Sequence, residues 1–196
     1  MSLRVLGIMG SPRRWSNTEL LLDAALDGAA HGGAATYKVV VCDLSIHPCT
    51  ECYACAQDGN CSIRDDMTRL YDDLVAADCI IMATPVFFYG FAAQAKALVD
   101  RCQALWMRRR VLRTWTPDVT ARRGALISVG ATRGPKLFDG MVLTAKYFFD
   151  AVGIREFDQL LVRGVDARAQ VRESPAHIEQ AMELGARLLL QPAGEQ

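Results

Sequence analysis

Five short apolar runs divide the chain, at residues 3–9, 37–42, 79–83, 125–129 and within 154–162. Each run is nearly continuous instead of alternating, which is typical of strands covered on both faces of a parallel sheet. Between the runs, apolar residues recur at helical spacing. The pattern predicts a five-stranded, doubly wound α/β fold of βαβ units, with helices on both faces of the sheet.

The predicted helices follow polar caps. The first is expected to begin near residue 17 and to end at Gly28, Gly32 and Gly33. Further helices are expected near residues 67–75, 92–107, 139–152 and 175–189. The helix at 139–152 has more bulky apolar residues than one stripe can hold, so we expect it to be buried against another subunit of a homodimer or homotetramer.

A strand order of 2-1-3-4-5 places ligands at the carboxyl ends of the first and third strands. The first strand runs through a polar loop into the N-terminus of a helix, where free N–H groups favour phosphate. This loop matches neither G-x-G-x-x-G nor the P-loop, which disfavours a dinucleotide clamp and a nucleoside triphosphatase. Its donors suit one phosphomonoester such as that of FMN, although Ser16 or Asn17 could serve only as a helix cap. These donors are Ser11, Ser16, Asn17 and Thr18, with Arg13 or Arg14 as the positive charge.

The loop after the third strand has three consecutive aromatic residues, which are not expected to stand in water without a reason. They can stack on an isoalloxazine ring, or the loop backbone can meet the polar edge of that ring; lid, core and subunit interface are the alternatives. The loop reads Thr84, Pro85, Val86, Phe87, Phe88, Tyr89 and Gly90. The loop after the fourth strand is small and flexible enough for close approach of a ligand, and it contributes Gly130, Ala131, Thr132 and Arg133.

Four of the seven cysteines fall between residues 49 and 61, in the spacing C-x2-C-x2-C-x5-C. Iron–sulfur clusters favour the C-x2-C-x2-C run, so a [4Fe–4S] cluster is the leading interpretation. Redox thiols, an empty loop and zinc, whose usual spacing is wider, are the alternatives. The candidate ligands, on a loop inserted after the second strand, are Cys49, Cys52, Cys55 and Cys61.

The remaining composition limits the partners. The 196 residues are expected to form one domain, and 22 basic against 22 acidic residues give no net field for nucleic acid or an anionic membrane. We see neither a membrane-spanning stretch nor a secretion signal. Seven cysteines without export favour the reducing cytoplasm.

A basic run follows the predicted helix at 92–107. It could hold the phosphates of a reduced pyridine nucleotide or the acidic face of an electron-transfer partner, and solvated surface is the alternative. The run comprises Arg108, Arg109, Arg110, Arg113, Arg122 and Arg123 around Trp115.

These motifs resemble NADPH-dependent FMN reductases and, more closely, iron–sulfur flavoproteins of the flavodoxin-like superfamily. Residues 10–18 resemble the FMN phosphate loop, residues 84–90 the isoalloxazine loop, and residues 49–61 the cysteine motif that binds a [4Fe–4S] cluster beside FMN. The resemblance implies an FMN-dependent oxidoreductase that moves electrons between NAD(P)H, or a small-molecule or protein redox partner, and an acceptor, with the flavin carrying the chemistry. A cluster-free NAD(P)H-dependent FMN or quinone reductase and a non-enzymatic electron carrier are the alternatives.

Overall fold

The computed structural model describes residues 2–190, which contain a five-stranded parallel sheet in the order β2-β1-β3-β4-β5. The predicted strand order is confirmed. Within the sheet, Val5 of the first strand pairs with Thr36 of the second strand on one side and with Cys79 of the third strand on the other. The strands are β1 (Arg4–Met9), β2 (Ala35–Val40), β3 (Cys79–Pro85), β4 (Arg123–Gly130) and β5 (Phe157–Arg163).

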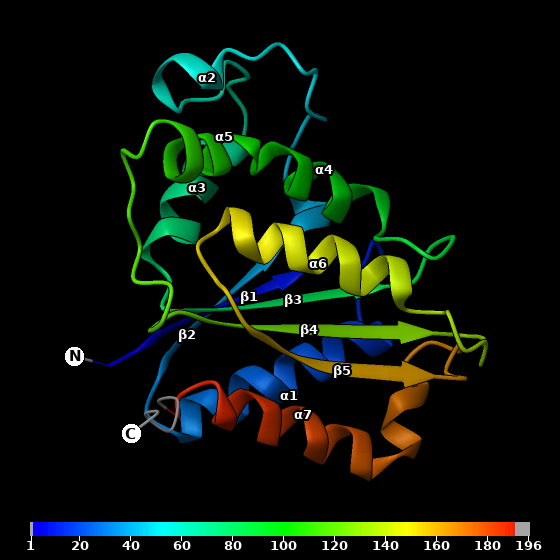
Figure 1. Ribbon diagram of the computed structural model, residues 1–196. Coiled ribbons are helices and arrows are strands. Elements are labelled where there is room, and N and C mark those ends of the chain that lie inside the picture. The colour runs from blue at the N-terminus through cyan, green and yellow to red at the C-terminus, as the bar shows by residue number, and fades with distance from the viewer. Residues whose placement is uncertain (1, 191–196) are drawn as a thin grey trace.

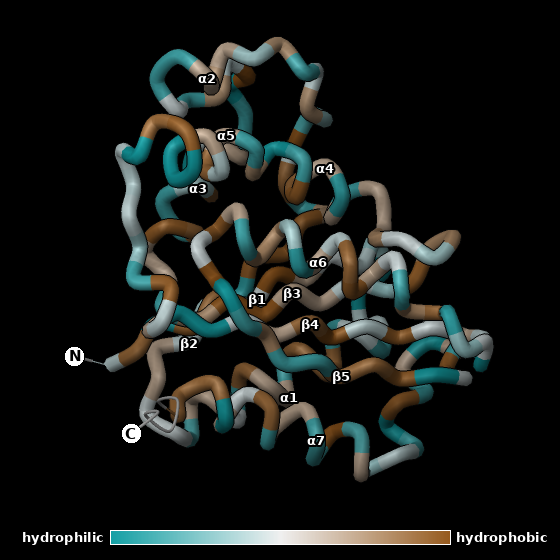
Figure 2. The backbone as a smooth tube through the Cα atoms, viewed as in Figure 1, coloured by the Kyte–Doolittle hydropathy of each residue, from teal (hydrophilic) through white to brown (hydrophobic). Residues whose placement is uncertain are grey.

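Helices cover both faces of the sheet, as predicted. In Figure 1, α1 (Asn17–His31) and α7 (Pro175–Arg187) lie on one face. The other face is covered by α3 (Met67–Ala76), α4 (Ala93–Arg101), α5 (Gln103–Trp106) and α6 (Asp139–Ala151). Successive residues of β1 point to opposite layers, so that Leu6 and Ile8 belong to the core under α3–α6, and Val5 and Met9 to the core against α1 and α7. Figure 2 shows hydrophobic residues concentrated along the central strands.

Short helical segments complete the chain: η1 (Val41–Asp43), α2 (Cys55–Asp58), η2 (Met107–Val111) and η3 (Gln170–Glu173). The single helix expected at 92–107 is divided at Cys102 and continues as η2, a π-helical turn in which the Leu112 N–H donates to the Met107 carbonyl. The second strand has the expected length but lies two residues earlier in the chain than predicted, and η1 begins at Val41. None of the helices within residues 2–190 is long and apolar enough to cross a bilayer.

The prediction that Gly28 ends the first helix is wrong. Gly28 lies inside α1, and a Cβ built there would come within 2.0 Å of the Met182 carbonyl oxygen of α7. A Cβ on Gly185 of α7 would come within 1.8 Å of the Ala25 carbonyl oxygen. The two glycines therefore let the backbones of α1 and α7 touch, and α1 ends later, before Gly32.

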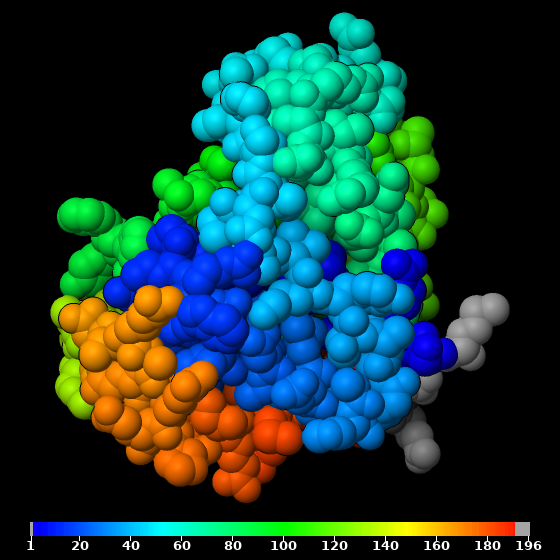
Figure 3. Space-filling view, turned by 180° about the vertical axis from the view of Figure 1, so that it is seen from behind, coloured from blue at the N-terminus to red at the C-terminus, as the bar shows by residue number. Residues whose placement is uncertain are grey.

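The cysteine loop, defined as residues 49–61, starts beyond the carboxyl end of β2 and crosses over the helical layer. It lies above α5 in Figure 1 and forms a raised lobe in Figure 3. Its base is closed by two residues, since the Ser45 N–H donates to Asp66 Oδ2 at 2.7 Å and the Asp66 N–H donates to the Ser45 carbonyl at 3.2 Å. The excursion therefore begins and ends at one place.

Candidate functional site

Three loops leave the carboxyl ends of β1, β3 and β4 as one continuous edge. The Gly10 N–H donates to the Ala83 carbonyl at 2.7 Å, and the Val86 N–H donates to the Val129 carbonyl at 3.0 Å. A Cβ on Gly10 would come within 2.7 Å of the Ala95 Cβ, so α4 approaches this edge closely. The strand ends expected to hold a ligand are thus brought together.

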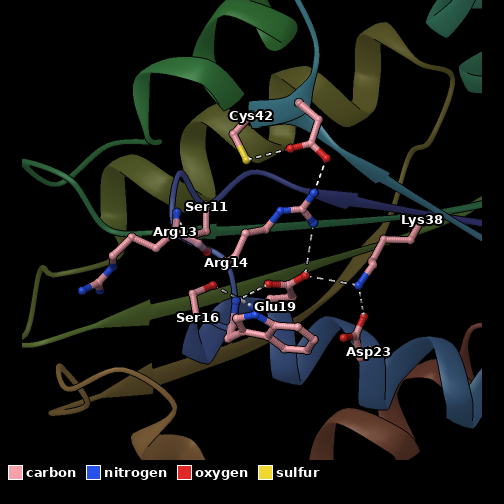
Figure 4. A network of polar contacts seen from close by, with 10 residues as sticks. Ser11, Arg13, Arg14, Ser16, Glu19, Asp23, Lys38 and Cys42 are labelled. Carbon is pink, nitrogen blue, oxygen red and sulfur yellow. Dashed lines mark hydrogen bonds and ion pairs between the residues drawn. The ribbon is translucent and has the colours of Figure 1, made fainter.

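At the first loop, one buried carboxylate gathers two cations. Glu19 is 4% exposed, and its Oε1 lies 3.3 Å from Lys38 Nζ and 3.7 Å from Arg14 Nη1. Arg14 also pairs with Asp43 (Figure 4). Arg13 extends away from this network in Figure 4 and forms no ion pair within the residues that the structure describes. Arg13 therefore remains available for an anionic ligand, whereas Arg14 is held by its neighbours.

Two of the predicted phosphate donors are engaged in the fold. Ser16 Oγ accepts the N–H of Glu19 at 3.1 Å and caps α1, so the capping interpretation applies to it. Asn17 Nδ2 donates to the Ala167 carbonyl at 2.9 Å, and Asn17 Oδ1 accepts the N–H of Val171 at 3.0 Å. Asn17 therefore ties the start of α1 to the segment after β5, a long-range role that the sequence pattern did not reveal.

Two hydroxyls of the same loop are buried near the positive end of α1. Ser11 and Thr18 are each 1% exposed, and Ser11 Oγ accepts the N–H of Arg13 at 3.2 Å. Trp15 has a φ of 57°, a left-handed conformation that costs a non-glycine residue about 1–2 kcal/mol. A strained turn with buried hydroxyls at a helix N-terminus fits a phosphate group.

The second loop is a two-residue hairpin with an aromatic tip. Phe87 and Gly90 exchange both backbone hydrogen bonds at 2.9 Å, and φ is 49° at Phe88 and 62° at Tyr89. Such a type I′ turn favours Asn-Gly, so two aromatic residues there are strained. The Phe88 ring is fully exposed. The predicted aromatic cluster thus exists as a surface projection; Thr84 and Pro85 belong to β3 and Val86 is half-buried.

The third loop is open to solvent and fastened at its base. Gly130 is buried, and its carbonyl accepts the N–H of Gly164 at 2.8 Å. Ala131, Thr132 and Arg133 are exposed. The Arg133 guanidinium covers Gly164, where a Cβ would come within 2.6 Å of Arg133 Cζ. Arg133 is therefore oriented by the residue after β5.

All four cysteines of the cysteine loop line one cavity of about 410 Å³. Cys55 and Cys61 are half-buried, and Cys49 and Cys52 are exposed. In this conformation no three metal-binding side chains of residues 2–190 converge on one point. The donor set nevertheless fits a four-thiolate centre, because four soft ligands on one short loop share a single cavity.

The backbone of the cysteine loop is strained around Cys52. Glu51 and Tyr53 have φ values of 55° and 57°. A hydrogen bond with Ser62, whose Oγ lies 3.3 Å from Cys52 Sγ, lowers the pKa of the Cys52 thiol. Burial, and then the neighbouring Cys61, raise the pKa of Cys55. Since backbone strain concentrates at functional sites, this geometry agrees with a binding role.

Arg101 contacts both sides of the cysteine loop and was missed by the sequence analysis. Nη1 donates to the His47 carbonyl at 2.9 Å, and Nη2 donates to the Ile63 carbonyl at 3.0 Å. The same nitrogens bond Asp65 at 2.7 and 3.2 Å. Burial would lower the pKa of Arg101, but the bonds to Asp65 outweigh it and the pKa is raised. The guanidinium therefore stays charged out of water.

Arg108 holds the far turn of the same loop. Its Nε donates to the Gly59 carbonyl at 2.8 Å and its Nη2 donates to Asn60 Oδ1 at 2.9 Å. Gly59 has a φ of 80°, and a Cβ there would come within 2.5 Å of Arg108 Cγ. A side chain at residue 59 would therefore displace the arginine.

The basic run has structural partners. Arg109 and Arg110 both pair with Asp150 of α6 at 2.5 Å. Arg122 donates to two carbonyls at the end of α3 and lies 5.5 Å from the centre of the Trp115 ring. For these arginines the contacts favour a role in the fold over nucleotide or partner binding.

The sheet is parallel in the order 2-1-3-4-5, and the loops after β1 and β3 meet where the strand order reverses. This arrangement defines a flavodoxin-like protein. The chain belongs to the NADPH-dependent FMN reductase family, whose sequence model matches residues 3–139. A solved flavone reductase superimposes with a TM-score of 0.71 at 18% identity, covering 95% of this chain and 62% of that one, which agrees with the fold.

Two curated relatives are named iron-sulfur flavoproteins. The chain is 37% identical over 131 residues to the one of Methanosarcina thermophila, covering 67% of this chain and 65% of that protein. It is 36% identical over 135 residues to one of Methanocaldococcus jannaschii, covering 67% and 64%. The matched region is thus less than two thirds of the length of each relative.

Proposed function

We propose that the chain is an FMN-dependent oxidoreductase that moves electrons between NAD(P)H or a redox partner and an acceptor, with a [4Fe–4S] cluster on the cysteine loop. The observation that carries the proposal is the single cavity that four cysteines share with the buried Arg101. Family membership supports FMN and NAD(P)H. The names of the relatives support the cluster.

The residues at the sheet edge would hold FMN. Ser11, Thr18 and Arg13 would bind its phosphate at the N-terminus of α1, while Ser16 and Asn17 hold that terminus in place. The hairpin at residues 84–90 and the loop at 130–133 would lie beside the ring. When bound, FMN accepts hydride and passes on single electrons. The chain's part is to bind and orient it, so no side chain is assigned a catalytic proton transfer.

The cysteine loop would hold the cluster through Cys49, Cys52, Cys55 and Cys61. Cys55 and Cys61 are half-buried and Cys49 and Cys52 are exposed, so the loop offers ligands both next to the protein core and next to solvent. Thiolate ligands persist in a reducing compartment, and the proposal therefore includes a cytoplasmic location.

The test is anaerobic purification followed by visible spectroscopy, iron analysis and dithionite reduction. We expect flavin bands together with a broad cluster absorbance and about four irons per chain, as a [4Fe–4S] centre requires. Cys52→Ala should abolish the iron, whereas the control Cys42→Ala, a half-buried cysteine outside the cavity, should keep it. Flavin without iron would instead identify a cluster-free FMN or quinone reductase.

A turnover assay separates an enzyme from a carrier. NAD(P)H oxidation by the holoprotein with a quinone or free FMN as acceptor is expected. A holoprotein that exchanges electrons only with partner proteins would be an electron carrier.

The proposal also includes self-association as a homodimer or homotetramer. On α6, Leu143 and Tyr147 are 57% and 65% exposed. The nearby hairpin reaches the first turn of this helix, since a Cβ on Gly140 would come within 2.4 Å of the Tyr89 carbonyl oxygen. These apolar side chains support an interface between copies. Light scattering of Leu143→Glu against the wild type tests it, and a monomeric wild type would contradict it.

A further inference from the structure

The cysteine cavity contains a permanent positive charge that is shielded from solvent. Arg101 is 1% exposed and lines the cavity together with the four thiols. Its Nε is buried and has no hydrogen-bond partner within the described residues, although both terminal nitrogens are bonded. An unpaired buried donor is costly, so this N–H has capacity for an acceptor that residues 2–190 do not supply.

The same guanidinium connects segments on the two sides of the loop. The carbonyls of His47 and Ile63, which accept its terminal nitrogens, lie two residues before Cys49 and two after Cys61. Asp65 fixes the orientation of the fork. One rigid side chain of α4 therefore sets the positions of both ends of the loop, which a single-point charge such as lysine cannot do.

We propose that Arg101 is a positioning residue for an anionic four-thiolate centre, holding both ends of the cysteine loop and placing a fixed positive charge beside the thiolates. The inference rests on the proposed function, because the cluster is the ligand concerned. A cluster bound by four thiolates is a polyanion that becomes more negative on reduction. A nearby buried cation stabilises the reduced state and raises the reduction potential.

The experiment compares Arg101→Gln, Arg101→Lys and Arg64→Gln with the wild type. Arg64 is an exposed arginine of the adjoining segment, so Arg64→Gln is a control that removes the same charge from the surface. Hydrogen exchange of residues 47–63 is measured in iron-free protein. Each variant is then loaded anaerobically with ferric iron, sulfide and a thiol reductant, and its iron content and midpoint potential are determined.

We expect Arg101→Gln to lose exchange protection at both ends of the loop and to bind the cluster about 10–100-fold more weakly, as for outer residues of metal sites. In the fraction that loads, the potential should fall below that of the wild type. Arg101→Lys should lose the same protection and keep the wild-type potential. Arg64→Gln should match the wild type throughout.

An unchanged potential in loaded Arg101→Gln would overturn the proposal, since a purely structural arginine predicts that result. If Arg101→Gln does not fold, Arg101→Lys decides: wild-type exchange protection, or a potential lowered in spite of the retained charge, would overturn it. A wild type that never takes up iron would defeat the proposed function, while the exchange comparison would still test the positioning of the loop.

Discussion

Arg101 and Asp65 form a bidentate ion pair, with Nη1–Oδ2 at 2.7 Å and Nη2–Oδ1 at 3.2 Å, and both side chains are almost fully buried. Thirty-six positions separate them in the sequence. Asp65 also accepts the N–H groups of His47 and Met67, so its carboxylate joins α3, α4 and the segment just before the cysteine loop. Removing either partner leaves a buried charge without compensation.

Asp65→Asn should therefore destabilise the protein by about 3–5 kcal/mol, the range for breaking a buried pair. Urea unfolding followed by circular dichroism measures the change. Asp72→Asn, which removes an exposed carboxylate of the nearby helix α3, should shift the free energy of unfolding by less than about 0.5 kcal/mol. Equal effects of the two substitutions would refute the structural role of the pair.

The free energy of unfolding should also depend on pH through the ionisation of Asp65. Burial would raise the pKa of Asp65, but hydrogen bonds from Arg101 and from the His47 N–H outweigh it and hold the pKa below its usual value of about 3.9. The stabilisation is therefore present above that usual value and is lost as the pH falls through the folded-state pKa. Urea midpoints of the wild type should fall on acidification below about pH 4 more steeply than those of Asp65→Asn. Parallel profiles would show that Asp65 does not titrate differently in the folded state.

The contact of α1 with α7 should not tolerate a methyl group. Gly185→Ala would place a Cβ within 1.8 Å of a backbone oxygen, so the helices must separate, at a cost of about 3 kcal/mol. Gly134→Ala is the matched control, because a Cβ at Gly134 meets nothing within 4 Å. Thermal unfolding should show a large drop for the first variant and almost none for the second.

Two substitutions at the hairpin tip separate strain from contact. Phe88→Gly and Phe88→Ala both remove the exposed ring, but only glycine relieves the φ of 49°. Phe88→Gly should be more stable than Phe88→Ala by about 1 kcal/mol. If the ring contacts FMN, flavin titrations should show the same loss of affinity in both. Wild-type affinity in either variant would exclude that contact.

Thiol labelling of the iron-free protein should divide the cysteines into two classes. Burial raises the pKa of Cys79 to about 11 and also raises that of Cys102, so neither should react in the folded chain. Cys52 is exposed and its pKa is lowered by the bond with Ser62, so it should react first. Iodoacetamide labelling read by peptide mass spectrometry gives the order, and early labelling of Cys79 would contradict the fold.

The sheet and its order were predictable because continuous apolar runs followed by polar loops have few other solutions. The single-domain organisation over residues 1–196 stays a prediction. The division of the helix near Cys102 was not visible, since Leu98 and Leu105, seven residues apart, keep helical spacing across the break.

The contacts of the candidate site were the least predictable. Asn17 looked like a phosphate donor because a local reading cannot see Ala167 or Val171, about 150 residues away. Arg101 looked like an ordinary end of a helix, because its partners are set by tertiary packing. The four cysteines of the C-x2-C-x2-C-x5-C motif, by contrast, are close together in the sequence. The motif alone therefore indicated the residues that line the cavity.

The hydrogen bonds between Ser45 and Asp66 close the base of the cysteine loop, which makes the loop a removable unit. Because Arg101 also holds the carbonyls of His47 and Ile63 together, a short turn can replace residues 48–62 while Asp65 stays paired with Arg101 and bonded to the start of α3. The flavodoxin-like sheet and the cysteine loop can therefore be inherited, exchanged or engineered separately. A chain of this architecture can gain or lose four neighbouring thiols in one genetic step while the loops at the carboxyl ends of its strands stay intact.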